Sequence, residues 1–219
     1  MRLNQFIAHA TGQSRRAADS IIEAGGVKVD GKAAHLGQII DQNNVVTLNN
    51  KVLLLPQTHT ILLHKPVGYV CSRDGQGSKT IYQLLPKELH SLKPAGRLDK
   101  DSSGLLLLTN DGALANKLTH PRYTKEKKYE VQLDKPLQKE HRAIIEGAGV
   151  MLGDGNSRLA LTPLSQQNHW RVTMREGRNR QIRRTFAKLG YTVTTLHRTV
   201  FGEYALADLP KGTYKNIEP

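Results

Sequence analysis

The sequence has 219 residues, 38% of them hydrophobic, which allows a packed core in one ordinary domain or in a small module joined to a larger one. Lys and Arg total 32 against 19 Asp and Glu, so the formal net charge of +13 predicts a polyanionic partner rather than a membrane surface. The single cysteine, Cys71, excludes an intrachain disulfide framework and a thiolate zinc cluster, and it fits a reducing cytoplasm. The longest aliphatic runs, residues 52–55 and 105–108, are too short to cross a bilayer, so we expect no membrane role.

Residues 1–55 predict a small unit of two helices and a hairpin. Apolar residues at helical spacing from Leu3 onward indicate the first helix. Ser14 is the expected N-cap of the second helix, which the glycines at 25–26 end. Residues 27–32 alternate between apolar and polar and turn at an Asp-Gly pair, which is typical of a β-hairpin.

Residues 61–219 predict a larger α+β unit after a polar linker at 56–60. Strands and helices do not alternate regularly along this part of the chain. We therefore expect a mixed, mostly antiparallel sheet flanked by helices rather than a doubly wound parallel sheet. The expected helices are at 111–118, 138–146 and 181–189, and the expected strands are at 61–64, 105–109, 128–133, 170–174 and 192–196.

The positive charge is concentrated between Arg171 and Arg198. This window of 28 residues contains seven arginines, one lysine and a single acid, Glu176, so it carries +7 of the total +13. A solvated basic helix is the ordinary interpretation of such a window. The excess of arginine favours a surface that faces RNA or DNA, because the planar guanidinium suits phosphates better than the ammonium of lysine does.

Residues 94–112 form a polar, glycine-containing loop that enters a wholly aliphatic strand and is followed by a turn and a helix. A buried strand holds such a loop rigidly, and rigid loops are where catalytic groups lie. Asp99 and Asp101 are the candidate acids, although spacing alone favours ordinary turn or capping roles for both. They are expected to point to different sides of an extended loop. Asp111 is the expected cap of the following helix.

Residues 96–112 resemble the catalytic motif of the RsuA/RluB-type rRNA pseudouridine synthases, in which Gly-Arg-Leu-Asp precedes a leucine-rich strand. Residues 65–68 resemble the Lys-Pro-x-Gly segment of that family, although His64 replaces its usual Asn. Residues 126–131 and 176–184 resemble its Glu-Lys-x-Tyr-x-Val strand and its arginine-rich helix start. The amino-terminal unit is similar to the small RNA-binding domain shared with a ribosomal small-subunit protein, so the resemblance covers nearly the whole chain.

This resemblance implies an isomerase that detaches uracil from its ribose and rejoins it through ring carbon five, with Asp99 as the essential carboxylate. Tyr129 matches the active-site tyrosine of the family, which stacks on the uracil, although a half-buried strand tyrosine is its ordinary interpretation. Arg183 matches the arginine that pairs with the catalytic aspartate. The reaction needs no cofactor, and the sequence contains no Walker or Gly-x-Gly-x-x-Gly helix start.

The expected partner is rRNA or a ribosomal assembly intermediate, bound by a monomer in the cytoplasm. No metal is expected, because the nine histidines form no zinc-binding pair on a helix. The expected RNA-binding residues are all cations, namely Arg15, Arg16, Lys65, Arg97, Arg178, Arg180 and Arg184.

Three alternatives remain at this point. A non-catalytic rRNA-binding assembly factor would have no need for a carboxylate among phosphates. A metal-dependent nuclease would use Asp99, Asp101 and Asp111. The substrate of an isomerase could also be small-subunit rRNA, although residues 178–181 favour the large-subunit members of the family.

Overall fold

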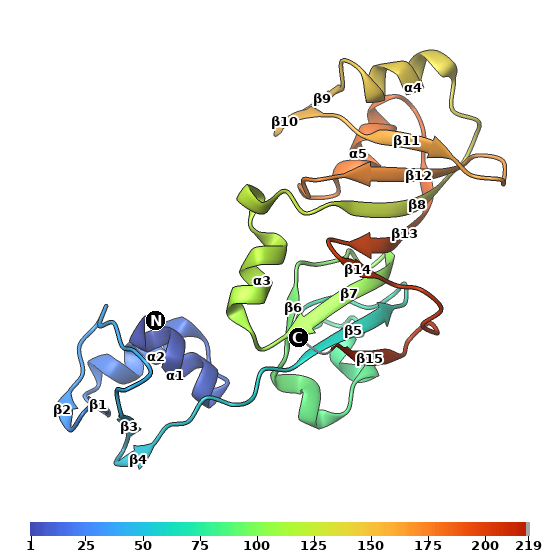
Figure 1. Ribbon diagram of the computed structural model, residues 1–219. Coiled ribbons are helices and arrows are strands. Elements are labelled where there is room, and N and C mark those ends of the chain that lie inside the picture. The colour runs from blue at the N-terminus through green and yellow to red at the C-terminus, as the bar shows by residue number, and fades with distance from the viewer. Residues whose placement is uncertain (218–219) are drawn as a thin grey trace. The chain divides into compact units, whose positions relative to one another are not determined.

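The computed structural model describes residues 1–217. The chain divides into two compact units, an N-terminal unit Met1–Thr58 and a C-terminal unit that begins at His59. Figure 1 shows the first in blue to cyan and the second in the remaining colours. The division falls inside the polar segment 56–60.

The N-terminal unit has two helices and a four-stranded sheet, whose buried side chains form one core. The Ser14 Oγ accepts a hydrogen bond from the Ala17 N–H at 3.1 Å, so Ser14 caps the second helix as predicted. Asp30 and Gly31 have φ values of 50° and 79°, the left-handed pair that a two-residue type I′ turn requires. The elements are α1 (Leu3–Thr11), α2 (Arg15–Glu23), β1 (Val27–Val29), β2 (Lys32–Ala33), β3 (Val46–Leu48) and β4 (Lys51–Val52), with sheet order β2-β1-β3-β4.

The C-terminal unit is built on a nine-stranded sheet with main order β11-β12-β8-β13-β7-β5-β15, to which β14 is added at β13 and β6 at β7. Within residues 59–217 the paired strands of this sheet are antiparallel, apart from β13 and β7, which are parallel. The predicted mixed, mostly antiparallel α+β fold is confirmed. The strands are β5 (Thr60–Lys65), β6 (Lys93–Ala95), β7 (Ser103–Thr109), β8 (Lys127–Leu133), β11 (Ala160–Pro163), β12 (His169–Met174), β13 (Val193–Phe201), β14 (Tyr204–Ala205) and β15 (Tyr214–Ile217).

Helices flank this sheet in three places (Figure 1). α3 packs beside β6 and β7, α4 beside β11, and α5 beside β13 and the separate β9–β10 hairpin. No helix within residues 1–217 is long and apolar enough to cross a membrane. The helices are α3 (Gly112–Thr119), α4 (Lys139–Glu146) and α5 (Gln181–Lys188), the 3₁₀ helices are η1 (Ile81–Leu84), η2 (Lys87–Ser91) and η3 (Pro121–Tyr123), and the hairpin is β9 (Val150–Leu152) with β10 (Gly155–Ser157).

Strands β5 and β7 form the buried centre, and every residue of both is buried. Their continuous aliphatic runs are typical of strands that are covered on both faces. Gly104, with φ +110°, allows β13 to approach β7 closely, because a Cβ there would lie 2.2 Å from the Arg198 carbonyl oxygen. The close parallel contact therefore places β13 directly beside the loop that leads into β7.

Candidate active site

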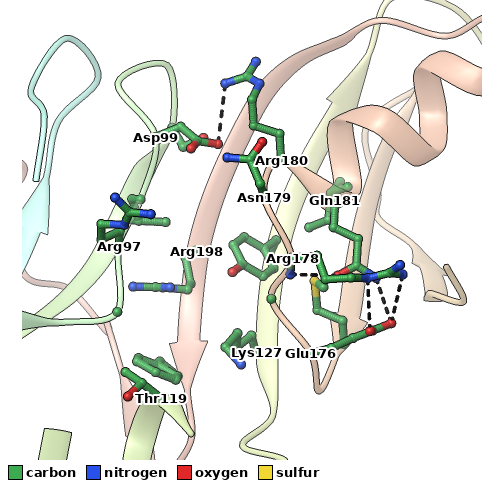
Figure 2. Close-up of a pocket in the computed structure, with 18 of the residues that line it drawn as sticks. Arg97, Asp99, Thr119, Lys127, Glu176, Arg178, Asn179, Arg180, Gln181 and Arg198 are labelled. Carbon is green, nitrogen blue, oxygen red and sulfur yellow. Dashed lines mark hydrogen bonds and ion pairs between the residues drawn. The ribbon is translucent and has the colours of Figure 1, made fainter. Parts of the chain in front are cut away.

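A pocket of about 900 Å³ lies in the C-terminal unit (Figure 2). The Asp loop (residues 96–102), which leads into β7, and the Arg loop (residues 175–180), which leads into α5, face each other across this pocket. Lys65, Arg183 and Arg184 do not line it, and Arg15 and Arg16 belong to the N-terminal unit. The pocket brings together five of the predicted site residues, namely Arg97, Asp99, Tyr129, Arg178 and Arg180.

Lys65 holds the Asp loop from inside the protein. Its side chain at the end of β5 is fully buried, and burial lowers its pKa. The Nζ atom donates to the carbonyl oxygens of Pro66, Asp99 and Ser102 at 3.0, 3.0 and 2.7 Å, which uses all three ammonium protons. The predicted contact of Lys65 with RNA is therefore wrong, because no phosphate can reach a buried and fully bonded ammonium.

Arg180 joins the two acids of the Asp loop. Its Nη1 and Nη2 atoms donate to the Asp101 carboxylate at 2.9 and 2.8 Å, and Nη1 also lies 3.5 Å from the Asp99 Oδ2. Figure 2 shows Asp99 and Arg180 on opposite walls with this ion pair between them. The side chain of Asp99 is 35% exposed, so the carboxylate is paired and still reachable from the pocket. The two aspartates thus share one guanidinium, contrary to the expectation that they point apart.

Arg183 contacts Asp101 and not the predicted Asp99. Its Nη2 donates to the Asp101 carbonyl oxygen at 2.8 Å, and its Nε lies 3.3 Å from the Asp101 carboxylate. Its Nη1 donates to the Val193 carbonyl oxygen at 2.7 Å, so the guanidinium is already occupied on two sides. The predicted Arg183–Asp99 pair is wrong, since Arg183 bonds to Asp101 and does not line the pocket, whereas Arg180 lines the pocket and reaches both carboxylates.

The pairing with arginine keeps Asp101 ionised. The hydrogen bonds from Arg180, with the positive charge of Arg183, lower the pKa of Asp101 from its ordinary value. A carboxylate whose pKa is lower in the folded state stabilises the fold above its unfolded pKa, and this contribution disappears as the pH falls through the folded pKa. The pairing of Asp101 with arginine therefore contributes fully at neutral pH, and its contribution falls away in acid as the pH drops towards the lowered pKa of Asp101.

Tyr129 lies on β8 with 8% of its surface exposed, and it lines the pocket. An aromatic ring at the wall of a polar pocket offers a face on which a nucleobase can stack. The Asp loop therefore presents a carboxylate, and β8 presents a ring, to the same pocket.

Two of the predicted phosphate-binding arginines are bound to Asp154, in the turn between β9 and β10. Arg184 donates to both carboxylate oxygens at 3.0 and 2.7 Å. Arg178 donates to the Asp154 carbonyl and carboxylate oxygens at 3.0 and 3.2 Å and to the Asn156 carbonyl oxygen at 2.8 Å. This turn anchors the Arg loop, so the guanidinium groups of Arg178 and Arg184 are engaged before any RNA arrives. Arg97 is exposed and forms no hydrogen bond or ion pair with residues 1–217, which leaves it available.

The sequence did not single out two cations that line the pocket, Lys127 on β8 and Arg198 on β13. Arg198 is 2% exposed, and its Nε donates to the Leu105 carbonyl oxygen at 2.9 Å. The alternation along β8 could have indicated that Lys127 shares a face with Tyr129. For Arg198 no such local signal exists, because its place depends on pairing with strands distant in the sequence.

Asp111 does not join the other two acids. Its carboxylate accepts hydrogen bonds from the Ala113 and Leu114 N–H groups at 2.7 and 3.1 Å, so it caps α3 as predicted. Within residues 1–217 no three His, Cys, Asp or Glu side chains lie close enough together to hold a metal ion. The thiol of Cys71 packs against the Asp loop, where burial raises its pKa and makes it a poor nucleophile.

Comparison with known proteins assigns a family to each of the two units. Residues 59–188 match the family described as RNA pseudouridylate synthase, and residues 1–53 match the S4 domain. The chain is 35% identical to ribosomal large subunit pseudouridine synthase B of Bacillus subtilis (strain 168), over 100% of the chain and 92% of that protein. It is 34% identical to ribosomal small subunit pseudouridine synthase A of Pasteurella multocida (strain Pm70), over 99% of the chain and 96% of that protein.

Two further relatives extend this result. Dual-specificity RNA pseudouridine synthase RluF of Salmonella typhi is 35% identical, over 99% of the chain and 75% of that protein. A solved structure described as a pseudouridylate synthase superposes with a TM-score of 0.72 and 32% identity, covering 100% of this chain and 96% of that one. The chain therefore belongs to the RNA pseudouridylate synthase family, with an S4 domain before the synthase domain.

Proposed function

We propose that this protein converts one uridine in rRNA to pseudouridine, with the Asp99 carboxylate as the essential group. In this isomerisation the bond between ribose C1′ and uracil N1 breaks and a bond between C1′ and uracil C5 forms. The hydrogen on C5 leaves as a proton and N1 gains one, so the atoms balance without an oxidant, a reductant or water. Asp99 can attack the sugar, attack the base or take a proton from the ribose, and each route requires an ionised carboxylate that faces the substrate.

The observation that carries this proposal is the common pocket of Asp99 and Tyr129 in a chain that matches pseudouridine synthases over its full length. Tyr129 holds the uracil by stacking once the base has left its helix. Arg180 aims the Asp99 carboxylate, and Arg183 and Lys65 act as positioning residues because they hold the loop backbone. Asp99 and Arg180 therefore meet the substrate, while the other two set the geometry.

The proposed substrate is large-subunit rRNA, acted on by a monomer in the cytoplasm. Relatives of this chain carry names that refer to the large subunit, the small subunit or dual specificity, which supports rRNA as the class of substrate. Residues 178–181 resemble those of the large-subunit members and favour that assignment. The S4 domain and the net charge of +13 support direct binding of RNA.

Mapping of pseudouridines in rRNA tests this proposal. The rRNA is compared between cells with the protein, cells without it, and cells that carry the Asp99→Asn variant. We expect one pseudouridine of large-subunit rRNA to be lost both without the protein and with the variant. A lost site in small-subunit rRNA would overturn the subunit assignment alone. Unchanged maps of both rRNAs would overturn the proposed substrate, and a restored site with Asp99→Asn would overturn the role of the carboxylate.

A further inference from the structure

Arg198 brings an uncompensated positive charge into the pocket. It is almost completely buried and lines the pocket wall, and only its Nε is used, in the bond to Leu105. The Nη2 atom is buried and has no hydrogen-bond partner among residues 1–217, nor does any acid in this part of the chain form an ion pair with Arg198. Burying a guanidinium without a counter-charge is costly. This arrangement indicates a ligand that supplies the missing negative charge.

The strand register places Arg198 beside the stacking ring. Arg198 pairs directly with Tyr129 across β13 and β8, and Phe201 pairs with Lys127 in the same ladder. Directly paired residues lie on the same face of a sheet with their Cβ atoms about 5 Å apart. Lys127 and Tyr129 are two residues apart on β8 and share that face as well. All four side chains line the pocket, and Figure 2 shows Arg198 and Lys127 below Asp99 in the view.

Lys127 is a second cation that forms no ion pair within residues 1–217, although the charge of Glu176 acts on it. Its Nζ donates to the Lys125 carbonyl oxygen at 3.2 Å. Burial, with the positive charge of Arg198, lowers the pKa of Lys127. Both cations lie over the Phe201 ring, with Lys127 Nζ 5.3 Å and Arg198 Cζ 4.8 Å from its centre. Two positive groups therefore converge on one ring, and the Glu176 carboxylate, which also lines the pocket, forms no ion pair with either of them within residues 1–217.

We propose that Arg198 and Lys127 form a phosphate subsite, which holds a phosphodiester next to the uridine that stacks on Tyr129. The inference rests on the proposed function, because it assigns a place to part of the same nucleotide. A phosphodiester carries its charge before, during and after the reaction, whereas uracil is neutral until its bond to ribose breaks. A permanent anion therefore matches two cations that face the pocket before any chemistry has occurred.

This subsite would fix the ribose for reaction. A nucleotide held by its ring on Tyr129 and by its phosphate on Arg198 has its sugar confined between the two contacts. Binding at these two points orients the ribose of the nucleotide towards Asp99. The bound phosphate also neutralises the buried charge, so RNA binding relieves a cost that the free protein bears.

The test compares uridine 3′,5′-bisphosphate, the smallest nucleotide with both flanking phosphates, with plain uridine. Affinities of the full-length protein are measured by titration at constant ionic strength, followed by NMR. Wild type should bind the bisphosphate about ten- to a hundredfold more tightly than uridine, the scale of hydrogen bonds to a charged group. Arg198→Gln and Lys127→Gln should each remove most of this preference and leave the affinity for uridine within about twofold. The 3′- and 5′-monophosphates then identify which phosphate is held.

Two controls separate the subsite from general charge and from misfolding. Arg171→Gln removes an exposed arginine of the same basic window, on β12 and outside the pocket, and should keep the phosphate preference. Arg198→Lys keeps the charge and should retain part of the preference, and thermal unfolding checks that each variant folds. Should Arg198→Gln fail to fold, Lys127→Gln decides the question, because its side chain is only half-buried.

Equal affinity of wild type for the bisphosphate and for uridine would overturn the subsite. An unchanged preference in folded Arg198→Gln and Lys127→Gln, even with lost turnover, would also overturn it and would indicate that the cations act on the base. These outcomes are independent of the rRNA maps. Nucleotide binding is measured without turnover, so a wrong rRNA assignment would not change the measured phosphate preference. Conversely, absence of the phosphate subsite would not change the pseudouridine maps of rRNA.

Discussion

In the N-terminal unit, Arg15 and Arg16 are exposed at the start of α2 and form no ion pair within residues 1–217. In the C-terminal unit, four arginines of the Arg loop and α5 are bound to acids, namely Arg178, Arg180, Arg183 and Arg184. The Arg15 side chain donates a hydrogen bond to the Asn4 Oδ1 at 3.3 Å. Arg180, by contrast, joins two carboxylates. Each of these arginines adds one positive charge to the net charge of +13, yet Arg15 and Arg16 are free for an external phosphate, whereas the four paired arginines already hold an acid.

This difference separates two uses of arginine. Free arginines at a helix start add affinity for any RNA backbone, because released counterions and the unpaired N–H groups of the helix favour phosphate. Arginines bound to acids fix the geometry of the site instead, because the planar guanidinium holds a carboxylate in one position. Replacing the acid-bound arginines of the C-terminal unit should therefore reduce turnover or stability, and replacing the free arginines of the N-terminal unit should reduce affinity.

The largest expected effect is that of Asp99→Asn. The amide keeps the shape of the side chain and removes its ionisation, so pseudouridine formation should fall at least about a thousandfold. RNA affinity and the free energy of unfolding should change little, since the side chain is partly exposed. Turnover is measured on saturating rRNA fragment, beside affinity in the same buffer. Wild-type turnover in the Asn variant would remove Asp99 from the reaction.

Lys65→Met tests the buried support of the Asp loop. Three carbonyl oxygens would lose their donor, so the free energy of unfolding should fall by about 3 kcal/mol, with turnover reduced as well. Denaturant unfolding measures the loss. Lys93→Met, which replaces an exposed lysine on β6, is the matched control and should change stability by less than about 0.5 kcal/mol. Equal stability of the two variants would contradict the role given to Lys65.

Arg180→Ala should lower turnover on saturating RNA by about tenfold or more, because Asp99 and Asp101 lose the fork that aims them. Arg180→Lys should recover little, since one ammonium cannot bridge two carboxylates. Arg171→Ala is the control, because Arg171 is an exposed arginine on β12 that lies outside the pocket. If Arg180→Ala keeps normal turnover and only flattens the salt dependence of binding, Arg180 is a phosphate contact and the proposed role in aiming Asp99 is wrong.

The smallest effect is expected in the N-terminal unit. Replacing Arg15 and Arg16 together by Gln should weaken RNA binding and reduce the slope of log affinity against log salt by about 1.5, as two phosphate contacts would. Turnover at saturating RNA should stay unchanged. Lys51→Gln, an exposed cation on β4, serves as the control within the same unit. A slope that is unaffected by the double variant would show that these free arginines do not bind RNA.

Much of this fold is predictable because its signals are local. The aliphatic runs of β5 and β7, the Ser14 cap and the Asp-Gly hairpin turn all depend on residues that are close in sequence. The β9–β10 hairpin was missed because strands of three residues have too little periodicity to stand out. Strand β15 has only four residues, and its place at the sheet edge depends on pairing with β5.

The site was predictable in its residue types but not in its pairings. The motif at 96–112 identifies Asp99, yet nothing local tells which arginine reaches its carboxylate, so Arg180 took the place expected for Arg183. The sequence predicts Lys65 to be a surface cation, because lysine is rarely buried. Its burial is possible here because its ammonium donates to three backbone carbonyl oxygens, two of which, those of Asp99 and Ser102, are distant in the sequence. The position of Arg198 in the pocket follows from its pairing with Tyr129, which is far away in the sequence.

The central claim is that this protein exchanges the C5 hydrogen of a uridine in rRNA for a bond to ribose, without a cofactor. The most direct measurement is tritium release from large-subunit rRNA labelled at C5 of its uridines, with purified protein in EDTA and no added nucleotide. We predict release to a plateau of one tritium per RNA molecule for wild type and background release for Asp99→Asn. No release from either ribosomal RNA by folded wild type, or equal release by the Asn variant, would contradict the account.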